Sequence, residues 1–235
     1  LSSIATMGDL THLNISHCVF CDATLAALRS LDRLESLFMS HTDVGPHGLS
    51  HIRQLTNLAH LDIAGCTEVT DEAVLELRHL TGLRFLSLSD CCELTDRGLQ
   101  VLSSLRSLTT LNLGRYVYAD VMQATDAGLA ALRHLTNLTQ LDLHESGDGV
   151  TDRGLGHLAE LTTLTSLNIA LCQGITDSGL LALRRLTGIV QLDIHSCRGI
   201  SDEGIHFLTA LTSLRQLNLS ACRQLTDDGL GALQQ

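Results

Sequence analysis

Leucine residues recur along the chain with two alternating periods. In LRFLSLSDC (83–91) apolar and polar residues alternate, which is the period of a β-strand. In LTDRGLQVLSSL (94–105), Leu99, Leu102 and Leu105 are three residues apart, with Val101 beside them, which is typical of one face of a helix. The pattern predicts that each unit of the chain forms a short strand, a loop, a helix and a second loop.

The strand pattern, L-x-x-L-x-L-x-x-C or a close variant, occurs nine times. The copies occupy residues 10–18, 34–42, 58–66, 83–91, 108–116, 138–146, 164–172, 189–197 and 214–222. Successive copies begin 24 to 26 residues apart, except that 30 residues separate the fifth from the sixth. A period of this length indicates an α/β solenoid in which neighbouring repeats share one core. We therefore expect a single repeat domain over residues 1–235.

The residues between strand and helix predict how each helix begins. In the fourth repeat Thr95 is placed to be the N-cap, with Leu94 and Leu99 at the positions of a hydrophobic staple. Asp96 follows the cap and complements the positive end of the helix dipole. Gly98 has counterparts at 128, 154, 179, 204 and 229. Because glycine weakens a helix, its recurrence predicts close contact with the backbone of a neighbouring repeat.

The charged residues partly follow the same pattern. The chain has 26 acidic and 15 basic residues, a net charge of −11, and every base is arginine. Many helices are expected to begin with aspartate and end with arginine, which suits the helix dipole; the arginines are Arg29, Arg53, Arg78, Arg133 and Arg184. The negative sign argues against binding to nucleic acid or to an anionic membrane. No run of 18 apolar residues predicts a membrane span.

The combination of the strand pattern with an I-T-D-x-G-L phrase, as in LNIALCQGITDSGL (167–180), resembles the cysteine-containing class of leucine-rich repeats. The resemblance covers essentially the whole chain. It implies a horseshoe-shaped solenoid with a parallel β-sheet on the concave face and helices on the convex face. It also implies protein–protein recognition, the role of similar repeats in F-box subunits of ubiquitin ligases.

Six of the eight cysteines share the last position of the strand pattern: Cys18, Cys66, Cys91, Cys172, Cys197 and Cys222. We expect their side chains to form an inward column of reduced thiols, which favours an intracellular, cytoplasmic location. The C-x-x-C at 18–21 next to His17 suggests instead a redox pair or half of a zinc site, but a second C-x-x-C is missing.

Two further sets of side chains fall on the predicted concave side. Four histidines there could hold a transition metal, although we expect them to be solvated: His12, His17, His41 and His60. Seven of the nine central strand positions are Asn or Asp: 14, 62, 112, 142, 168, 193 and 218. Two interpretations of this row stay open. It either binds a partner or is repeat consensus, with each side chain bonded to its neighbour along the stack. We expect no catalytic residue, cofactor or metal.

The fifth repeat contains an insertion. Tyr116 and Thr125 are nine residues apart, where Cys91 and Thr95 are four apart, so five residues have been added within Tyr116–Ala124. The next repeat has one extra residue in the same loop, in ESGDGVTD (145–152). Neutral drift would favour polar residues, yet this loop contains both tyrosines of the chain. We predict a partner-binding site there, formed by Arg115, Tyr116, Tyr118, Met122, Asp142, His144 and Glu145.

These observations predict a non-catalytic scaffold that binds a protein partner through its concave face and the rim at the fifth and sixth repeats. One alternative is the substrate-recognition arm of an F-box ubiquitin ligase, and another is an architectural subunit of a large assembly. The chain begins without methionine and ends without a polar capping segment. We therefore expect it to be part of a longer protein.

Overall fold

The protein is an open parallel β-sheet covered on one face by helices. The structure is a computed structural model that describes residues 2–116 and 124–233. In these residues nine strands pair in chain order. They are β1 His12–Asn14, β2 Ser36–Phe38, β3 His60–Asp62, β4 Phe85–Ser87, β5 Thr110–Asn112, β6 Gln140–Asp142, β7 Ser166–Asn168, β8 Gln191–Asp193 and β9 Gln216–Asn218. Equivalent residues lie opposite each other, so that Leu111 pairs with Leu86 and Leu141.

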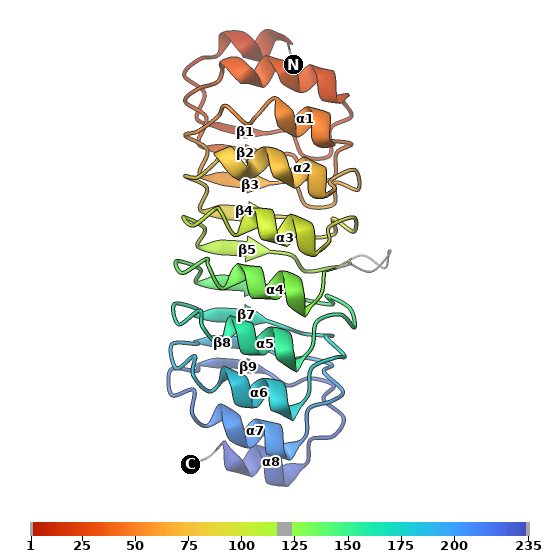
Figure 1. Cartoon of the computed structure of the whole chain (residues 1–235), viewed down its shortest axis with the longest axis vertical. Coiled ribbons are helices and arrows are strands. Elements are labelled where there is room, and N and C mark those ends of the chain that lie inside the picture. The colour runs from red at the N-terminus through yellow and green to blue at the C-terminus, as the bar shows by residue number, and fades with distance from the viewer. Residues whose placement is uncertain (1, 117–123, 234–235) are drawn as a thin grey trace.

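The helices form a second layer in front of the sheet and are stacked from one end of the chain to the other (Figure 1). The α-helices are α1 Pro46–Ser50, α2 Asp71–Leu75, α3 Asp96–Leu102, α4 Asp126–Leu132, α5 Asp152–Leu158, α6 Asp177–Leu183, α7 Asp202–Leu208 and α8 Asp227–Ala232. Three 3₁₀-helices are η1 Ser2–Thr6, η2 Asp22–Ser30 and η3 Glu76–His79. The arrangement confirms the predicted nine-repeat solenoid. None of these helices is long and apolar enough to cross a bilayer.

The predicted N-caps are confirmed for the helices that begin at 96, 126, 152, 177, 202 and 227, where a Thr or Ser hydroxyl accepts a backbone hydrogen bond. Thr70 is the N-cap of α2 without such a bond. The Thr95 hydroxyl accepts a hydrogen bond from the backbone N–H of Arg97 (3.2 Å), and Leu94 and Leu99 are buried. The first repeat differs, because Cys21 occupies the N-cap of η2 without a side-chain capping bond. In the second repeat Pro46 is the first residue of α1, where its missing N–H is not needed.

The recurrent glycine does make room for the neighbouring repeat, but for a side chain more than for backbone. A Cβ atom on Gly154 would lie 2.5 Å from Oδ1 of Asp126, the first residue of the preceding helix. That oxygen accepts hydrogen bonds from the backbone N–H groups of Thr151 (2.8 Å) and Gly154 (2.9 Å). Asp126 Oδ2 accepts from the Thr151 hydroxyl (2.6 Å). The aspartate therefore links two repeats in addition to complementing its own helix dipole.

The same Asp-to-Thr/Ser link joins most neighbouring repeats. In each pair the aspartate accepts from the backbone N–H and from the hydroxyl of the next N-cap residue. The pairs are Asp71–Thr95, Asp96–Thr125, Asp126–Thr151, Asp152–Thr176, Asp177–Ser201 and Asp202–Thr226. The T-D-x-G-L phrase thus specifies a row of hydrogen bonds along the solenoid.

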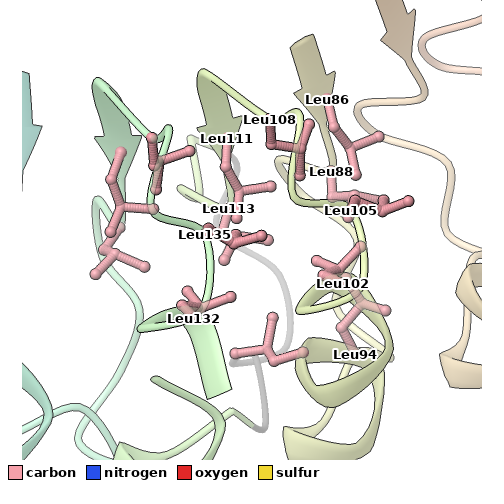
Figure 2. Close-up of a cluster of buried hydrophobic side chains, with 14 of the residues drawn as sticks. Leu86, Leu88, Leu94, Leu102, Leu105, Leu108, Leu111, Leu113, Leu132 and Leu135 are labelled. Carbon is pink, nitrogen blue, oxygen red and sulfur yellow. The ribbon is translucent and has the colours of Figure 1, made fainter. Parts of the chain in front are cut away.

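The space between sheet and helices is filled by layers of aliphatic side chains. Leu108, Leu111 and Leu113 of the fifth repeat are at most 1% exposed, and Figure 2 shows them beside Leu102 and Leu132 from the helix layer. Burying one leucine side chain contributes about 1.5–3 kcal/mol. Since each repeat supplies an equivalent layer, stability comes from many similar contacts rather than from a few large aromatic residues.

Five of the six cysteines predicted to turn inward do so. The Cys172 Sγ atom donates to the Leu143 carbonyl oxygen (3.2 Å), and Cys197 and Cys222 donate to Ile169 and Ile194 in the same way (3.2 Å each). Burial raises the pKa of the Cys172 thiol to about 11. The prediction is wrong for Cys18, which is exposed. Each inward thiol bonds to a carbonyl of the preceding repeat, whereas β1 is the first of the described strands.

Candidate functional site

The inserted loop leaves the sheet after β5. Residues 117–123 lie outside the described part of the chain, so the predicted contributions of Tyr118 and Met122 stay predictions. The described residues before them, Gly114, Arg115 and Tyr116, show how the loop departs from the repeat.

Arg115 occupies the loop position that is left-handed in the other eight repeats. In those repeats φ lies between 54° and 67°, at His17, His41, Gly65, Asp90, Glu145, Leu171, Ser196 and Ala221. Arg115 does not share this conformation. Its backbone N–H donates to the His144 carbonyl (2.7 Å), and the residue is only 5% exposed. The predicted surface role for its guanidinium is therefore not supported by its position.

Tyr116 bridges three repeats at the rim of the solenoid. Its ring is stacked on His144 of the sixth repeat, with centroids 4.9 Å apart. Its hydroxyl donates a short hydrogen bond to Asp142 of the same repeat, and its backbone N–H donates to Asp90 Oδ1 of the fourth repeat (2.8 Å). Burial raises the pKa of the Tyr116 phenol, and the hydrogen bond to the Asp142 carboxylate raises it further. Even so, 55% of Tyr116 is exposed.

Glu145 lies beside this cluster, in the loop that has one extra residue. It is half-buried and left-handed, and its backbone N–H donates to the Ala170 carbonyl (2.8 Å). Gly147, with φ of 82°, accommodates the turn. Ser146 replaces the column cysteine and bonds to the Leu143 carbonyl. The structure thus brings Tyr116, Asp142, His144 and Glu145 together at one rim.

The row of Asn and Asp side chains has a structural role that the sequence analysis did not foresee. The Asp142 Oδ1 atom accepts from the backbone N–H of His144 (2.8 Å), two residues later. The same bond to residue i+2 occurs at all seven positions, namely 14, 62, 112, 142, 168, 193 and 218. The predicted bond between neighbours is seen, among described residues, only from Asn218 to Asp193 (2.9 Å). The row therefore fixes the turns after the strands.

The concave face has a polar hollow of about 720 Å³ over strands β4 to β9. It is lined by the row members at 112, 142, 168, 193 and 218, by the central leucines of β5 to β9 and by Arg215. The first residue of each of the strands β4 to β9 completes the lining: Phe85, Thr110, Gln140, Ser166, Gln191 and Gln216. Asp142 belongs to this lining, so Tyr116 contacts the edge of the hollow. The sequence analysis did not include these first positions, because their residue type differs from repeat to repeat. Each precedes a leucine in its strand, and this alternation predicts that its side chain lies on the solvent side of the sheet.

Stacked imidazole rings mark the rim of the first two repeats. The His17 and His41 rings are parallel within 13°, with centroids 4.8 Å apart, and both residues are exposed. Across residues 2–116 and 124–233, no group of three or more His, Cys, Asp or Glu is placed to hold a metal ion.

Comparison with known proteins agrees with this architecture. The family model described as "Leucine Rich repeat" matches residues 79–103, 160–183 and 210–233. Internalin C2 of Listeria monocytogenes is 21% identical, with a TM-score of 0.69 over 92% of this chain and 84% of that one. The internalin inlF of the same organism is 20% identical, with a TM-score of 0.56 over 99% of this chain and 74% of that one. None of the curated proteins matches the sequence.

Three stretches of the chain match the leucine-rich repeat model, and the fold of the chain is a leucine-rich-repeat solenoid. Solenoids of this kind offer extended concave surfaces for binding, so the fold is consistent with a protein-interaction scaffold.

Proposed function

We propose that the protein is a non-catalytic scaffold that binds a protein partner through its concave face and the rim at the fifth and sixth repeats. The observation that carries this proposal is the exposed ring of Tyr116 at the edge of the polar hollow, where its hydroxyl bonds to Asp142. Tyrosine combines a large apolar surface with a polar tip and is enriched at interface hot spots.

The surroundings of Tyr116 support this proposal. The His144 ring and the Asp142 carboxylate hold the tyrosine in one orientation, so that little side-chain entropy remains to be lost on binding. We assign contact roles to Tyr116, His144, Asp142 and Glu145. For Arg115, which is buried, we propose that it positions Tyr116.

Tyr118 and Met122 complete the proposed site as apolar anchors. An F-box ubiquitin-ligase arm and an architectural subunit remain alternative hypotheses. The column of buried thiols supports an intracellular location, because such a column suits a reducing compartment.

The proposal can be tested once a partner has been captured from an extract of the source organism and purified. Tyr116→Ala should weaken binding by about thirtyfold, corresponding to about 2 kcal/mol at a hot spot. Leu181→Ala is the matched control, because Leu181 is also exposed but lies in helix α6. The double variant Gln140→Arg/Gln191→Arg, which fills the hollow, should also weaken binding.

The melting temperatures of these variants should stay within a few degrees of the wild type, because the changed side chains are exposed. If neither Tyr116→Ala nor Gln140→Arg/Gln191→Arg changes the affinity, the partner binds elsewhere. If only Gln140→Arg/Gln191→Arg weakens binding, the rim is not part of the site.

A further inference from the structure

Arginine residues gather on one edge of the solenoid although the chain is acidic overall. This edge is made by the connections from each helix to the next strand, 31–35, 51–59, 80–84, 103–109, 133–139, 159–165, 184–190 and 209–215. It contains Arg33, Arg53, Arg84, Arg106, Arg133, Arg184, Arg185 and Arg215, all exposed. The opposite edge, from strand to helix, instead carries exposed or half-buried acids such as Asp43, Glu68, Asp90, Glu93 and Asp148.

The connections in the central part of this edge, 80–84, 103–109 and 133–139, contain no Asp or Glu. We call Arg84, Arg106 and Arg133, together with Arg78 of the neighbouring helix η3, the arginine edge; Glu76 of η3 is paired with Arg53. Among described residues none of the four forms an ion pair, whereas outside this set Arg33 pairs with Asp9 (2.6 Å) and Arg53 with Glu76 (3.8 Å). Arg78 donates to Nε2 of its neighbour His79 (3.0 Å).

The helix dipole does not explain the whole arginine edge. Arg78 lies in the last turn of η3 and Arg133 is the C-cap of α4, so both stabilise a helix end. Arg106 lies four residues beyond the end of α3, and Arg84 immediately precedes β4. The effect of the dipole falls off within the last turn. These two exposed cations therefore contribute little to the fold through the dipole.

We propose that the arginine edge binds an acidic, extended polypeptide segment of a partner. The planar guanidinium group pairs with carboxylates through two parallel hydrogen bonds. Stacked repeats are about 5 Å apart at the strands and about 8–10 Å apart at the helices. Arg84, Arg106 and Arg133 belong to three successive helix-to-strand connections. An extended chain with an acidic residue at every second position, about 7 Å apart, presents several carboxylates along this edge.

A polypeptide suits this edge better than nucleic acid does. The connections 80–84, 103–109 and 133–139 contain no Phe, Tyr or Trp on which a base could stack. They contain exposed or half-buried hydroxyl residues between the arginines, including Thr81, Ser107 and Thr136, which can donate to a peptide carbonyl or carboxylate.

This surface lies on the other edge of the sheet from the rim at Tyr116. Tyr116 and Glu145 follow the strands, on the strand-to-helix edge, whereas the arginine edge precedes them. One partner could therefore occupy each edge, and each site can be tested without changing the other.

Fluorescence anisotropy with a labelled peptide of alternating glutamate and serine tests the proposal. The wild type should bind this peptide, and Arg84→Gln/Arg106→Gln/Arg133→Gln should bind about tenfold more weakly. The matched control is Arg97→Gln/Arg153→Gln/Arg198→Gln, which removes the same charge from exposed positions on the opposite edge. The control should bind at most twofold to threefold more weakly, and raised salt should weaken binding to the wild type.

Three outcomes would overturn the proposal. The first is no binding of the peptide by the wild type at low salt, and the second is equal weakening in the two triple variants, which would make the effect one of net charge. The third is stronger displacement of the labelled peptide by a short DNA duplex than by unlabelled peptide, when both are added at the same concentration of negative charges. That result would show that the edge prefers phosphate groups to carboxylates. Circular dichroism on both triple variants verifies that they are folded.

Discussion

At the scale of single residues, the last position of the strand pattern has two different roles, an exposed one at Tyr116 and a buried one at the cysteines. Tyr116 stands where most repeats have a buried cysteine, yet its side chain is exposed at the rim. Its contacts with Asp142 and His144 hold an exposed aromatic ring in place. The buried cysteines fill the equivalent position and bond to the repeat before them.

The raised pKa of Tyr116 predicts its behaviour in alkaline solution. In a Tyr118→Phe variant, where Tyr116 is the remaining tyrosine, phenolate absorbance should appear with a midpoint above the ordinary value of about 10. Because the pKa of Tyr116 is higher in the folded state, the protonated phenol stabilises the fold. This contribution is complete at pH values below the ordinary pKa of about 10, and it is lost as the pH rises through the pKa of the folded state. Adding Asp142→Asn should lower the midpoint. An ordinary midpoint in both variants would contradict the hydrogen bond.

Thiol reactivity should separate the cysteines into two groups. Burial raises the pKa of Cys197 to about 12, so its reactive thiolate is scarce near neutral pH. Cys18 and Cys21 are exposed, and hydrogen bonds with Thr24 lower the pKa of Cys21. A disulfide reagent should modify Cys18 and Cys21 rapidly in the folded protein, and the buried column only after unfolding. Mass spectrometry identifies the modified residues; rapid modification of Cys197 would contradict the inward column.

At the scale of elements, each helix is tied to its neighbour by the hydrogen bonds of an aspartate. This link explains why glycine stands at the third helical position despite its low helix propensity. A side chain there would occupy the place of the carboxylate that caps the next loop. The helices α3 to α8 keep this arrangement, whereas the first repeat, with Cys21 as its N-cap, forms a 3₁₀-helix instead.

Two glycines of α5 provide a direct test of this link. In Gly154→Ala the new Cβ would lie 2.5 Å from Asp126 Oδ1 and 2.8 Å from Leu129 Cδ1, so unfolding free energy should fall by about 1–3 kcal/mol. In Gly156→Ala the new Cβ meets nothing within 4 Å, so stability should rise by about 0.5–1 kcal/mol. Urea denaturation measures both values. Equal effects of the two substitutions would show that the contact with Asp126 does not matter.

At the scale of the whole molecule, the stacking of similar repeats produces both stability and surface chemistry. Each repeat contacts only its neighbours, so stability is close to a sum of repeat and interface terms. The same stacking aligns the strand ends on one edge and the helix ends on the other. Small preferences for Asp at helix starts and Arg at helix ends therefore add up to two edges of opposite charge.

Hydrogen exchange should follow the stacking. Amides of the central strands, such as Leu111 in β5 and Leu141 in β6, should exchange most slowly, because these strands are paired on both sides. Amides of β1 and β9, at the two edges of the sheet, should exchange faster. Native-state exchange measured by NMR or mass spectrometry provides the test. Uniform protection across all strands would indicate that the chain opens only as one unit.

The sequence by itself determined the repeat number, the strands, the helix starts and the inward leucines. These features depend on local periodicity and on capping residues close in sequence, as at Thr95 and Asp96. The sequence also located the rim at Tyr116, Asp142, His144 and Glu145, because an insertion breaks a regular period.

Only the tertiary structure decided which groups meet across repeats. The partner of Gly154 is the Asp126 carboxylate, 28 residues earlier in the chain. The Asn/Asp row bonds to its own loops, Cys18 is exposed, and Arg115 is buried. The physical reason is that a repeat motif shows which residues are equivalent, whereas burial and hydrogen bonding depend on what the adjacent repeat places against each of them.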